Sequence, residues 1–178
     1  MTETEFPTWI KKTDLAVGFT SFVAAIFIIL DTHLAHYTLI MALIITLFAI
    51  GLARAARGAA VKSKGTPRRV TNIVFGIIVI ILIVIVIFVP GLSEDIQIRL
   101  IAGSFLLMGI ARLIIGIIED DVPRNPRILQ FIVGLLTIIV SVLVLIAPVP
   151  EFVLAILFLG TIAAMNGLSR IARGYVGV

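Results

Sequence analysis

Cysteine is absent from the chain, and charged residues are scarce. Without cysteine the protein has no disulfide, no thiolate metal ligand and no cysteine nucleophile. Charged residues make up only 13% of the chain, against about 25% in a typical soluble domain. These shortages argue against a soluble enzyme.

The chain is instead rich in apolar residues, which form 61% of it and give a mean hydropathy of +1.24. About 20 apolar residues in a helix cross the ~30 Å hydrocarbon layer of a membrane. Apolar runs of that length occupy roughly residues 14–31, 38–57, 71–89, 98–118, 128–147 and 151–173. The sequence therefore predicts an all-α integral membrane protein with six transmembrane helices in one membrane domain over residues 1–178.

One short phrase recurs at a fixed spacing. It covers Gly51–Gly58, Gly109–Gly116 and Gly167–Gly174, and its first glycines are 109 − 51 = 58 and 167 − 109 = 58 residues apart. Earlier glycines keep the same step at Gly18, Gly76 and Gly134. We therefore expect three repeated antiparallel hairpins, over about residues 11–58, 69–116 and 127–174. Two crossings return the chain to the same side, so these are parallel repeats related by rotation about the membrane normal.

The distribution of charge predicts the orientation. In this scheme 13 of the 14 lysines and arginines fall on one side of the membrane, and only Arg99 falls on the other. The positive-inside rule then places both termini on the cytoplasmic side of the cell membrane. The same bias explains the high isoelectric point, so it is no sign of nucleic-acid binding. Lys11 and Lys12 before an apolar run resemble a signal peptide, but no small-x-small cleavage site follows, and we expect this run to be the first helix.

The glycines are typical of helix packing in lipid, where small residues let two backbones approach closely. In each phrase the Gly, Arg and Gly at i, i+3 and i+7 share one helix face. Gly18 and Gly51 lie at similar depth, so we expect a tight crossing inside the first hairpin. The predicted packing glycines are Gly18, Gly51, Gly76, Gly109, Gly134 and Gly167.

The arginine of each phrase needs a partner if it lies inside the membrane, where it costs about 2.5–3.5 kcal/mol at the bilayer centre. Polar acceptors occur at matching depth and at the 58-residue step. The predicted polar layer joins Arg54, Arg112 and Arg170 to Asp14, Asn72 and Gln130, within or between hairpins, with Asp14 and Arg54 at matching depth in the first hairpin. Arg112 is the deepest of the three arginines. The alternative is that the arginines only anchor helix ends, which loop charge and the helix dipole favour.

Two histidines, His33 and His36, lie beside Asp31, with Glu94, Asp95 and Glu151 on the same side. They are weak candidates for a zinc or copper site, or for a pH-sensing cluster. Because the pair occurs in only one hairpin, we favour two interfacial histidines in a polar loop. No Walker loop, zinc-protease motif or paired acid and base is present, so we expect no catalytic residues, cofactor or metal.

These features together resemble the HdeD-like acid-resistance membrane proteins. The likeness rests on six helices in three hairpins, an early glycine in each odd helix, Pro90 and Pro148 after outer helix ends, and the Gly-hydrophobic-small-Arg phrase, over about residues 11–174. The first hairpin departs from it, with Thr32 in place of the proline. The resemblance implies a non-enzymatic membrane protein linked to stress or acid tolerance, with no catalytic residues.

An enzymatic function is disfavoured, and two other classes of function stay open. The first is a protein that acts by helix packing, by oligomerisation or as an accessory subunit of a membrane complex, with lipid, a second copy or other membrane proteins as partners. The second is a pathway for a small solute or proton, which needs a continuous polar stripe. Its candidates are Thr20, Thr46, Ser104, Thr137, Ser141, Thr161 and Asn166, which are equally typical of hydrogen bonds in helix packing.

Overall fold

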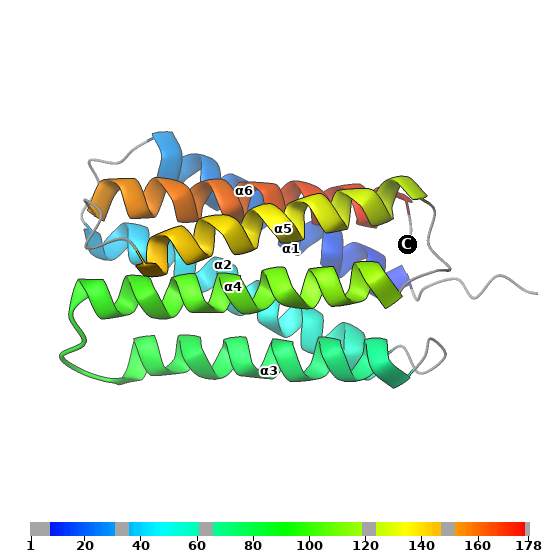
Figure 1. Ribbon diagram of the computed structural model, residues 1–178, viewed down its shortest axis with the longest axis horizontal. Coiled ribbons are helices and arrows are strands. Elements are labelled where there is room, and N and C mark those ends of the chain that lie inside the picture. Colours follow the sequence, from blue (N-terminus) through cyan, green and yellow to red (C-terminus); the bar gives the residue numbers. More distant parts are fainter. Residues whose placement is uncertain (1–7, 31–35, 61–65, 119–123, 147–151, 177–178) are drawn as a thin grey trace, which may run out of the picture.

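A computed structural model describes residues 8–30, 36–60, 66–118, 124–146 and 152–176, without the side chains of 124–126, 173 and 176. These residues form six antiparallel helices (Figure 1). The helices are α1 (Thr8–Leu30), α2 (His36–Ala60), α3 (Thr66–Phe88), α4 (Glu94–Ile118), α5 (Arg124–Ile146) and α6 (Phe152–Val176). Each is long and apolar enough to cross a membrane.

Most of the helices extend beyond the apolar runs in the sequence. α1 begins at Thr8 and contains Lys11 and Lys12, although the first predicted run starts near residue 14. Hydropathy marks where a helix enters an apolar layer, whereas backbone hydrogen bonding continues through the charged residues that flank it. The helix bounds keep the spacing of the sequence phrase: α1, α3 and α5 begin at 8, 66 and 124, and 66 − 8 = 124 − 66 = 58.

Local sequence explains the turn between α3 and α4. Pro90 follows α3 and removes a backbone donor, and Gly91 takes a positive φ of 83° that suits glycine. Ser93 then precedes α4, and its hydroxyl accepts a hydrogen bond from the backbone NH of Ile96 at 3.4 Å. Glu94 and Asp95 occupy the first turn of α4, where the helix dipole favours negative charge.

The even helices form the centre of the bundle, and the odd helices surround them. In the apolar stretches of α2, α4 and α6, 56%, 56% and 50% of residues are buried, against 28–33% in α1, α3 and α5. The three even helices also contact one another. Their shared core is apolar, and it includes Leu43, Leu47, Phe105, Ile156 and Leu159.

The most extensive helix pairs are α1 with α6, α4 with α5, and α2 with α3. Each of these pairs is joined by two of the packing glycines, namely Gly18 with Gly167, Gly109 with Gly134, and Gly51 with Gly76. A Cβ atom added to Gly167 would lie 2.8 Å from the carbonyl oxygen of Gly18, closer than van der Waals contact allows. Backbone therefore packs directly on backbone at these crossings.

The predicted crossing of Gly18 with Gly51 is wrong. Both glycines lie at a close helix contact, but each faces a helix outside its own hairpin. Depth along the chain is the same for both neighbours of α1, so depth alone could not tell α2 from α6. The bundle is closed into a ring by α6 and α1, and the glycines make that closure.

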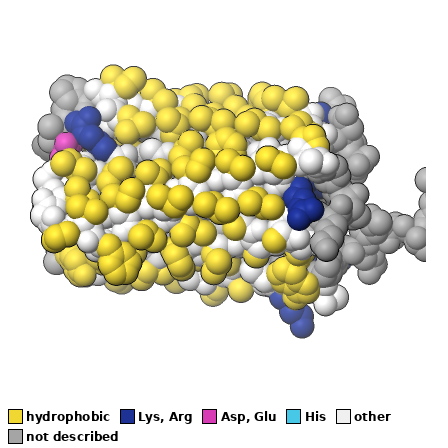
Figure 2. Space-filling view, turned by 90° about the horizontal axis from the view of Figure 1, so that it is seen from below, with side chains coloured by type: hydrophobic (Ala, Val, Ile, Leu, Met, Phe, Trp, Pro, Cys, Tyr) yellow, Lys and Arg dark blue, Asp and Glu magenta, His cyan; other side chains and the backbone are white. Residues whose placement is uncertain are grey.

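The outside of the bundle is apolar along its length. Figure 2 looks at the bundle from the side on which α3 lies in Figure 1, and hydrophobic side chains cover its middle while Lys and Arg lie near the two ends. Exposed side chains on this and other faces include Ile81, Ile87, Phe19, Ile45 and Leu143. A surface of this kind suits hydrocarbon as its solvent better than water.

Candidate functional site

A buried polar network lies at the end of the bundle where α1, α3 and α5 begin and α2, α4 and α6 end. We call this the basic end, and the other the opposite end. Asp14 of α1 is 3% exposed, and its Oδ1 accepts a hydrogen bond from Nη1 of Arg170 at 2.9 Å. Its Oδ2 forms an ion pair with Nη2 of Arg57. Nη2 of Arg170 also donates to the carbonyl oxygen of Ile50 at 3.3 Å. Asp14 therefore ties α1 to both α2 and α6.

A second contact of the network joins two central helices. Arg112 of α4 is only 1% exposed, and its Nη1 donates to the hydroxyl of Ser169 on α6 at 2.9 Å. Arg112 is the least exposed of the buried arginines that the structure describes. The repeat pattern does not single out Ser169, because the matching positions 58 and 116 residues earlier are Ala111 and Ala53.

All six residues of the predicted polar layer are buried. Arg54, Arg112 and Arg170 are at most 5% exposed, and Asp14, Asn72 and Gln130 are 3–5% exposed. Of the predicted pairings, the structure records Arg170 with Asp14. Asn72 instead donates from Nδ2 to the carbonyl oxygen of Arg68, one turn earlier in its own helix, at 3.1 Å.

Asp14 contacts arginines of two different helices. Its recorded partners are Arg170 and Arg57, and Arg57 was not a predicted member of the layer. The contact with Arg170 joins different hairpins, because α1 packs mainly on α6 and its carboxylate faces the last arginine phrase. Arg57 lies three residues after Arg54, one turn nearer the end of α2, and reaches the carboxylate from there.

This network suits the joining of helices. Guanidinium groups stay charged at all physiological pH values and present several donors in a fixed plane. Buried ion pairs are costly to bring out of water, and removing one partner leaves an uncompensated charge. The network therefore specifies which helices meet at the basic end, because an alternative packing would bury a charge without its partner.

The opposite end has a contact between the first residues of the three central helices. His36 begins α2, Glu94 begins α4 and Phe152 begins α6, at a spacing of 94 − 36 = 152 − 94 = 58. Nδ1 of His36 lies 2.9 Å from Oε2 of Glu94, and the imidazole stacks on the Phe152 ring at a centroid distance of 3.7 Å. The side chains of His36 and Glu94 are 50% and 57% exposed, so the pair is open to water.

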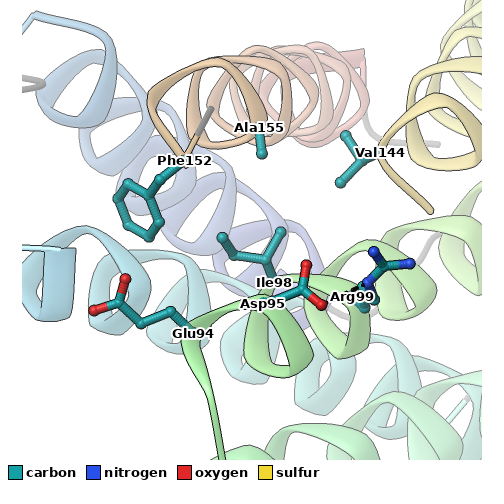
Figure 3. A pocket seen from close by; sticks show the side chains of 7 residues that line it. All are labelled: Glu94, Asp95, Ile98, Arg99, Val144, Phe152 and Ala155. Atoms are coloured by element: carbon teal, nitrogen blue, oxygen red, sulfur yellow. Dashed lines mark hydrogen bonds and ion pairs between the residues drawn. The ribbon is translucent and has the colours of Figure 1, made fainter. Parts of the chain in front are cut away.

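A small hollow of about 130 Å³ lies beside this contact (Figure 3). Its walls come from α4, α5 and α6, and they include Glu94, Phe152 and Val144. Arg99 crosses one side of it, where its Nε donates to Oδ2 of Asp95 at 2.9 Å and its Nη1 to the carbonyl oxygen of Leu145 at 3.1 Å. The charges of Arg99 and Asp95 on this side of the hollow therefore pair with each other.

His33, Asp31 and Glu151 of the predicted histidine cluster lie outside the described residues. Among the residues that the structure describes, no group of three or more His, Cys, Asp or Glu side chains is placed to hold a metal ion. The contact of His36 with Glu94 was not predicted as such. Its signal was available in the sequence, because residues 58 apart on the central helices share the same height.

Six of the seven mid-helix polar residues singled out in the sequence turn back on their own backbones. These are Thr20, Thr46, Ser104, Thr137, Thr161 and Asn166, each of which donates to the carbonyl oxygen four residues earlier at 2.6–2.9 Å. The seventh, Ser141, is fully buried, and its hydroxyl has no hydrogen-bond partner among the described residues. Such bonds satisfy a polar donor inside one helix. In these six residues the donors therefore serve single helices and form no chain from one end of the bundle to the other.

Comparison of the chain with models of protein families, with curated proteins and with solved structures finds no match. The likeness to the HdeD-like proteins therefore stays a prediction from the sequence.

Proposed function

We propose that the chain is a multi-pass protein of the cell membrane, built from three repeated hairpins with both termini on the cytoplasmic side. We further propose that it acts without catalysis, through helix packing, oligomerisation or contact with other membrane proteins, and that it serves stress or acid tolerance as the HdeD-like resemblance implies. The observation that carries this proposal is a bundle that is apolar outside and apolar at its centre.

The filled centre supports a packing role over a solute pathway. Phe105, Met108, Leu47, Ile156 and Leu159 occupy the region between the central helices and are at most 1% exposed. A channel or transporter needs polar groups facing a continuous route, whereas six of the seven mid-helix donors serve their own backbones. The charged network at the basic end then holds α1, α2, α4 and α6 together.

A labelling experiment tests insertion and orientation. The chain has no cysteine, so single cysteines can be introduced by Ser93→Cys at the opposite end and Thr66→Cys at the basic end. Both positions are exposed. In intact cells a membrane-impermeant maleimide should react with the first variant at once and with the second only after the membrane is permeabilised. Equal labelling of both variants in intact cells would contradict insertion, and the reverse pattern would contradict the orientation.

Two further measurements separate the functions. Proteoliposomes containing the protein should show the same proton and small-solute flux as empty liposomes, because the described core between the central helices is apolar. A flux that depends on the protein would favour the pathway instead. Cells that lack the gene should survive acid challenge less well than cells in which it is restored. Equal survival would remove the stress role and leave the packing role.

A further inference from the structure

A groove of about 420 Å³ runs over the outer surface between α1 and α2. Four of its lining side chains are small, namely Thr20, Ala24, Ala42 and Thr46. The other four are Phe19, Val23 and Phe27 of α1 and Ile45 of α2, which are 48–63% exposed. The two threonine hydroxyls donate to carbonyl oxygens of their own helices at 2.9 and 2.8 Å. The groove therefore offers an apolar surface to whatever fills it.

Three of the four small lining residues belong to the first hairpin alone, whereas the fourth, Thr46, matches Ser104 in the second hairpin. Adding 58 to positions 20, 24 and 42 gives Ile78, Leu82 and Leu100, and adding 58 again gives Leu136, Val140 and Phe158. The bundle thus accommodates large side chains at the same places in α3 to α6. The small residues of α1 and α2 are not required by the architecture, and they open a space that the other hairpins fill from within.

The position of the groove along the helices matches one leaflet of a membrane. Phe27 and Phe19 lie three and eleven residues from Leu30, the last residue of α1, which corresponds to about 5 and 16 Å. Ala42 and Thr46 lie six and ten residues from His36, or about 9 and 15 Å. Half of a ~30 Å hydrocarbon layer is about 15 Å. The groove therefore covers the depth of the acyl chains at the opposite end.

We propose that this groove binds one acyl chain of a phospholipid from the leaflet at the opposite end of the bundle. This inference rests on the proposed insertion in a membrane. The eight residues that line the groove are apolar or carry a hydroxyl that already bonds within its own helix, so the groove offers no free polar partner, and an acyl chain matches this lining. Because lipid tails and side chains are equally apolar, the binding comes from dispersion contacts that an unfilled groove would lose.

Tyr37 gives the headgroup region of this lipid a polar contact. It lies in the first turn of α2 and is 68% exposed. It is eight residues before Ile45, hence on the same row of side chains, about 12 Å nearer the opposite end. Tyrosine is enriched at membrane interfaces, and its hydroxyl can donate to an ester or phosphate oxygen. The matching positions are Asp95 and Val153, so this feature too belongs to the first hairpin.

The test uses the full chain in vesicles of phosphatidylcholine that contain a phosphatidylcholine with a photoreactive diazirine near the end of one acyl chain. After illumination, mass spectrometry locates the cross-links. The double variant Ala24→Leu, Ala42→Leu fills the groove with the residues that the second hairpin carries. Gly103→Leu is the matched control, because it adds a leucine on α4 where nothing lies within 4 Å. Tyr37→Phe removes the headgroup donor alone.

In the unmodified protein, cross-links should concentrate on residues 19–27 and 42–46, and filling the groove should lower their yield by about tenfold, the effect of a moderate loss of affinity. Gly103→Leu should leave the yield unchanged, and Tyr37→Phe should lower it by a smaller factor. Cross-links spread evenly over all outer helices of the unmodified protein would overturn the proposal without use of any variant. So would a dimer, seen by native mass spectrometry, that the filled variant loses.

The cysteine labelling described above keeps the two proposals apart. If labelling shows that Ser93→Cys and Thr66→Cys lie on opposite sides of the membrane, and the cross-links are still spread evenly over the outer helices, the groove proposal alone is wrong. If the labelling shows no insertion, both proposals fall.

Discussion

Two glycines of α4 allow the backbone crossings to be measured against an internal control. An alanine at Gly109 would place its Cβ 2.9 Å from the carbonyl oxygen of Gly134 and 3.1 Å from the backbone nitrogen of Ile138. An alanine at Gly103, in the same helix, would meet nothing within 4 Å. The two variants make the same chemical change, and they differ in what surrounds the added methyl group.

The magnitude follows from two contributions. Alanine is favoured over glycine in a helix by about 1 kcal/mol, and this gain applies at both positions. Overpacking a tight contact costs about 1–3 kcal/mol, and it applies only at Gly109 because backbone atoms cannot rotate away. Gly103→Ala should thus raise the free energy of unfolding by about 1 kcal/mol. Gly109→Ala should be less stable than Gly103→Ala by about 1–3 kcal/mol, since the helix term cancels in the comparison.

The assay is reversible unfolding in mixed detergent and SDS micelles, followed by far-ultraviolet circular dichroism. Gly109→Leu extends the series, because its larger side chain should separate α4 from α5 and cost more than alanine does. If Gly103→Ala and Gly109→Ala unfold with equal free energies, the close crossing of α4 with α5 does not hold the bundle together, and the reasoning from glycine contacts is refuted.

The same unfolding assay tests three further predictions on the polar contacts. Arg112→Ala should lower stability by about 1–3 kcal/mol because it leaves the buried Ser169 hydroxyl without its donor, and Arg112→Lys should be intermediate because it keeps the charge and loses the planar fork. A lysine variant as unstable as the alanine variant would contradict that order. Asp14→Asn should cost more, about 3–5 kcal/mol, because two buried guanidinium groups lose their shared countercharge; tolerance of this change would show that the ion pairs do not hold α1. His36→Asn should cost at most about 1 kcal/mol, because its pair with Glu94 is half exposed, and a larger loss would mean that this contact locks the opposite end.

The helices and the residues at their close contacts could be predicted because both follow from the spacing of residue types along the sequence. Apolar runs predict spans, and a fixed step between marked residues predicts equivalent heights. Gly167 and Gly18 were both identified as packing residues on these grounds. Their pairing was not, because sequence gives a residue's height and its face on a helix but not which neighbouring helix lies against that face.

The partners in the polar network escaped prediction for a related reason. Arg57 reaches Asp14 through a long side chain, and Ser169 meets Arg112 across the centre of the bundle. The second phrase carries Ile115 where Arg57 would recur, the side chain of the matching Arg173 in the third phrase lies outside the described residues, and alanines stand where Ser169 would recur. Repetition predicts what the repeated segments of the sequence have in common, whereas these contacts depend on residues in which the segments differ.

The ring closure between α6 and α1 imposes an order on biosynthesis. α1 is made before α6, yet α6 is its most extensive neighbour, and the residues of the ion pair Asp14–Arg170 are 156 positions apart. At translation rates of about 5–20 residues per second, α1 waits roughly 8–30 s for that partner. During this interval its carboxylate can meet Arg57 of α2, which emerges much earlier. The arginine nearer in sequence can therefore hold the first helix in place until the last one arrives to complete the ring.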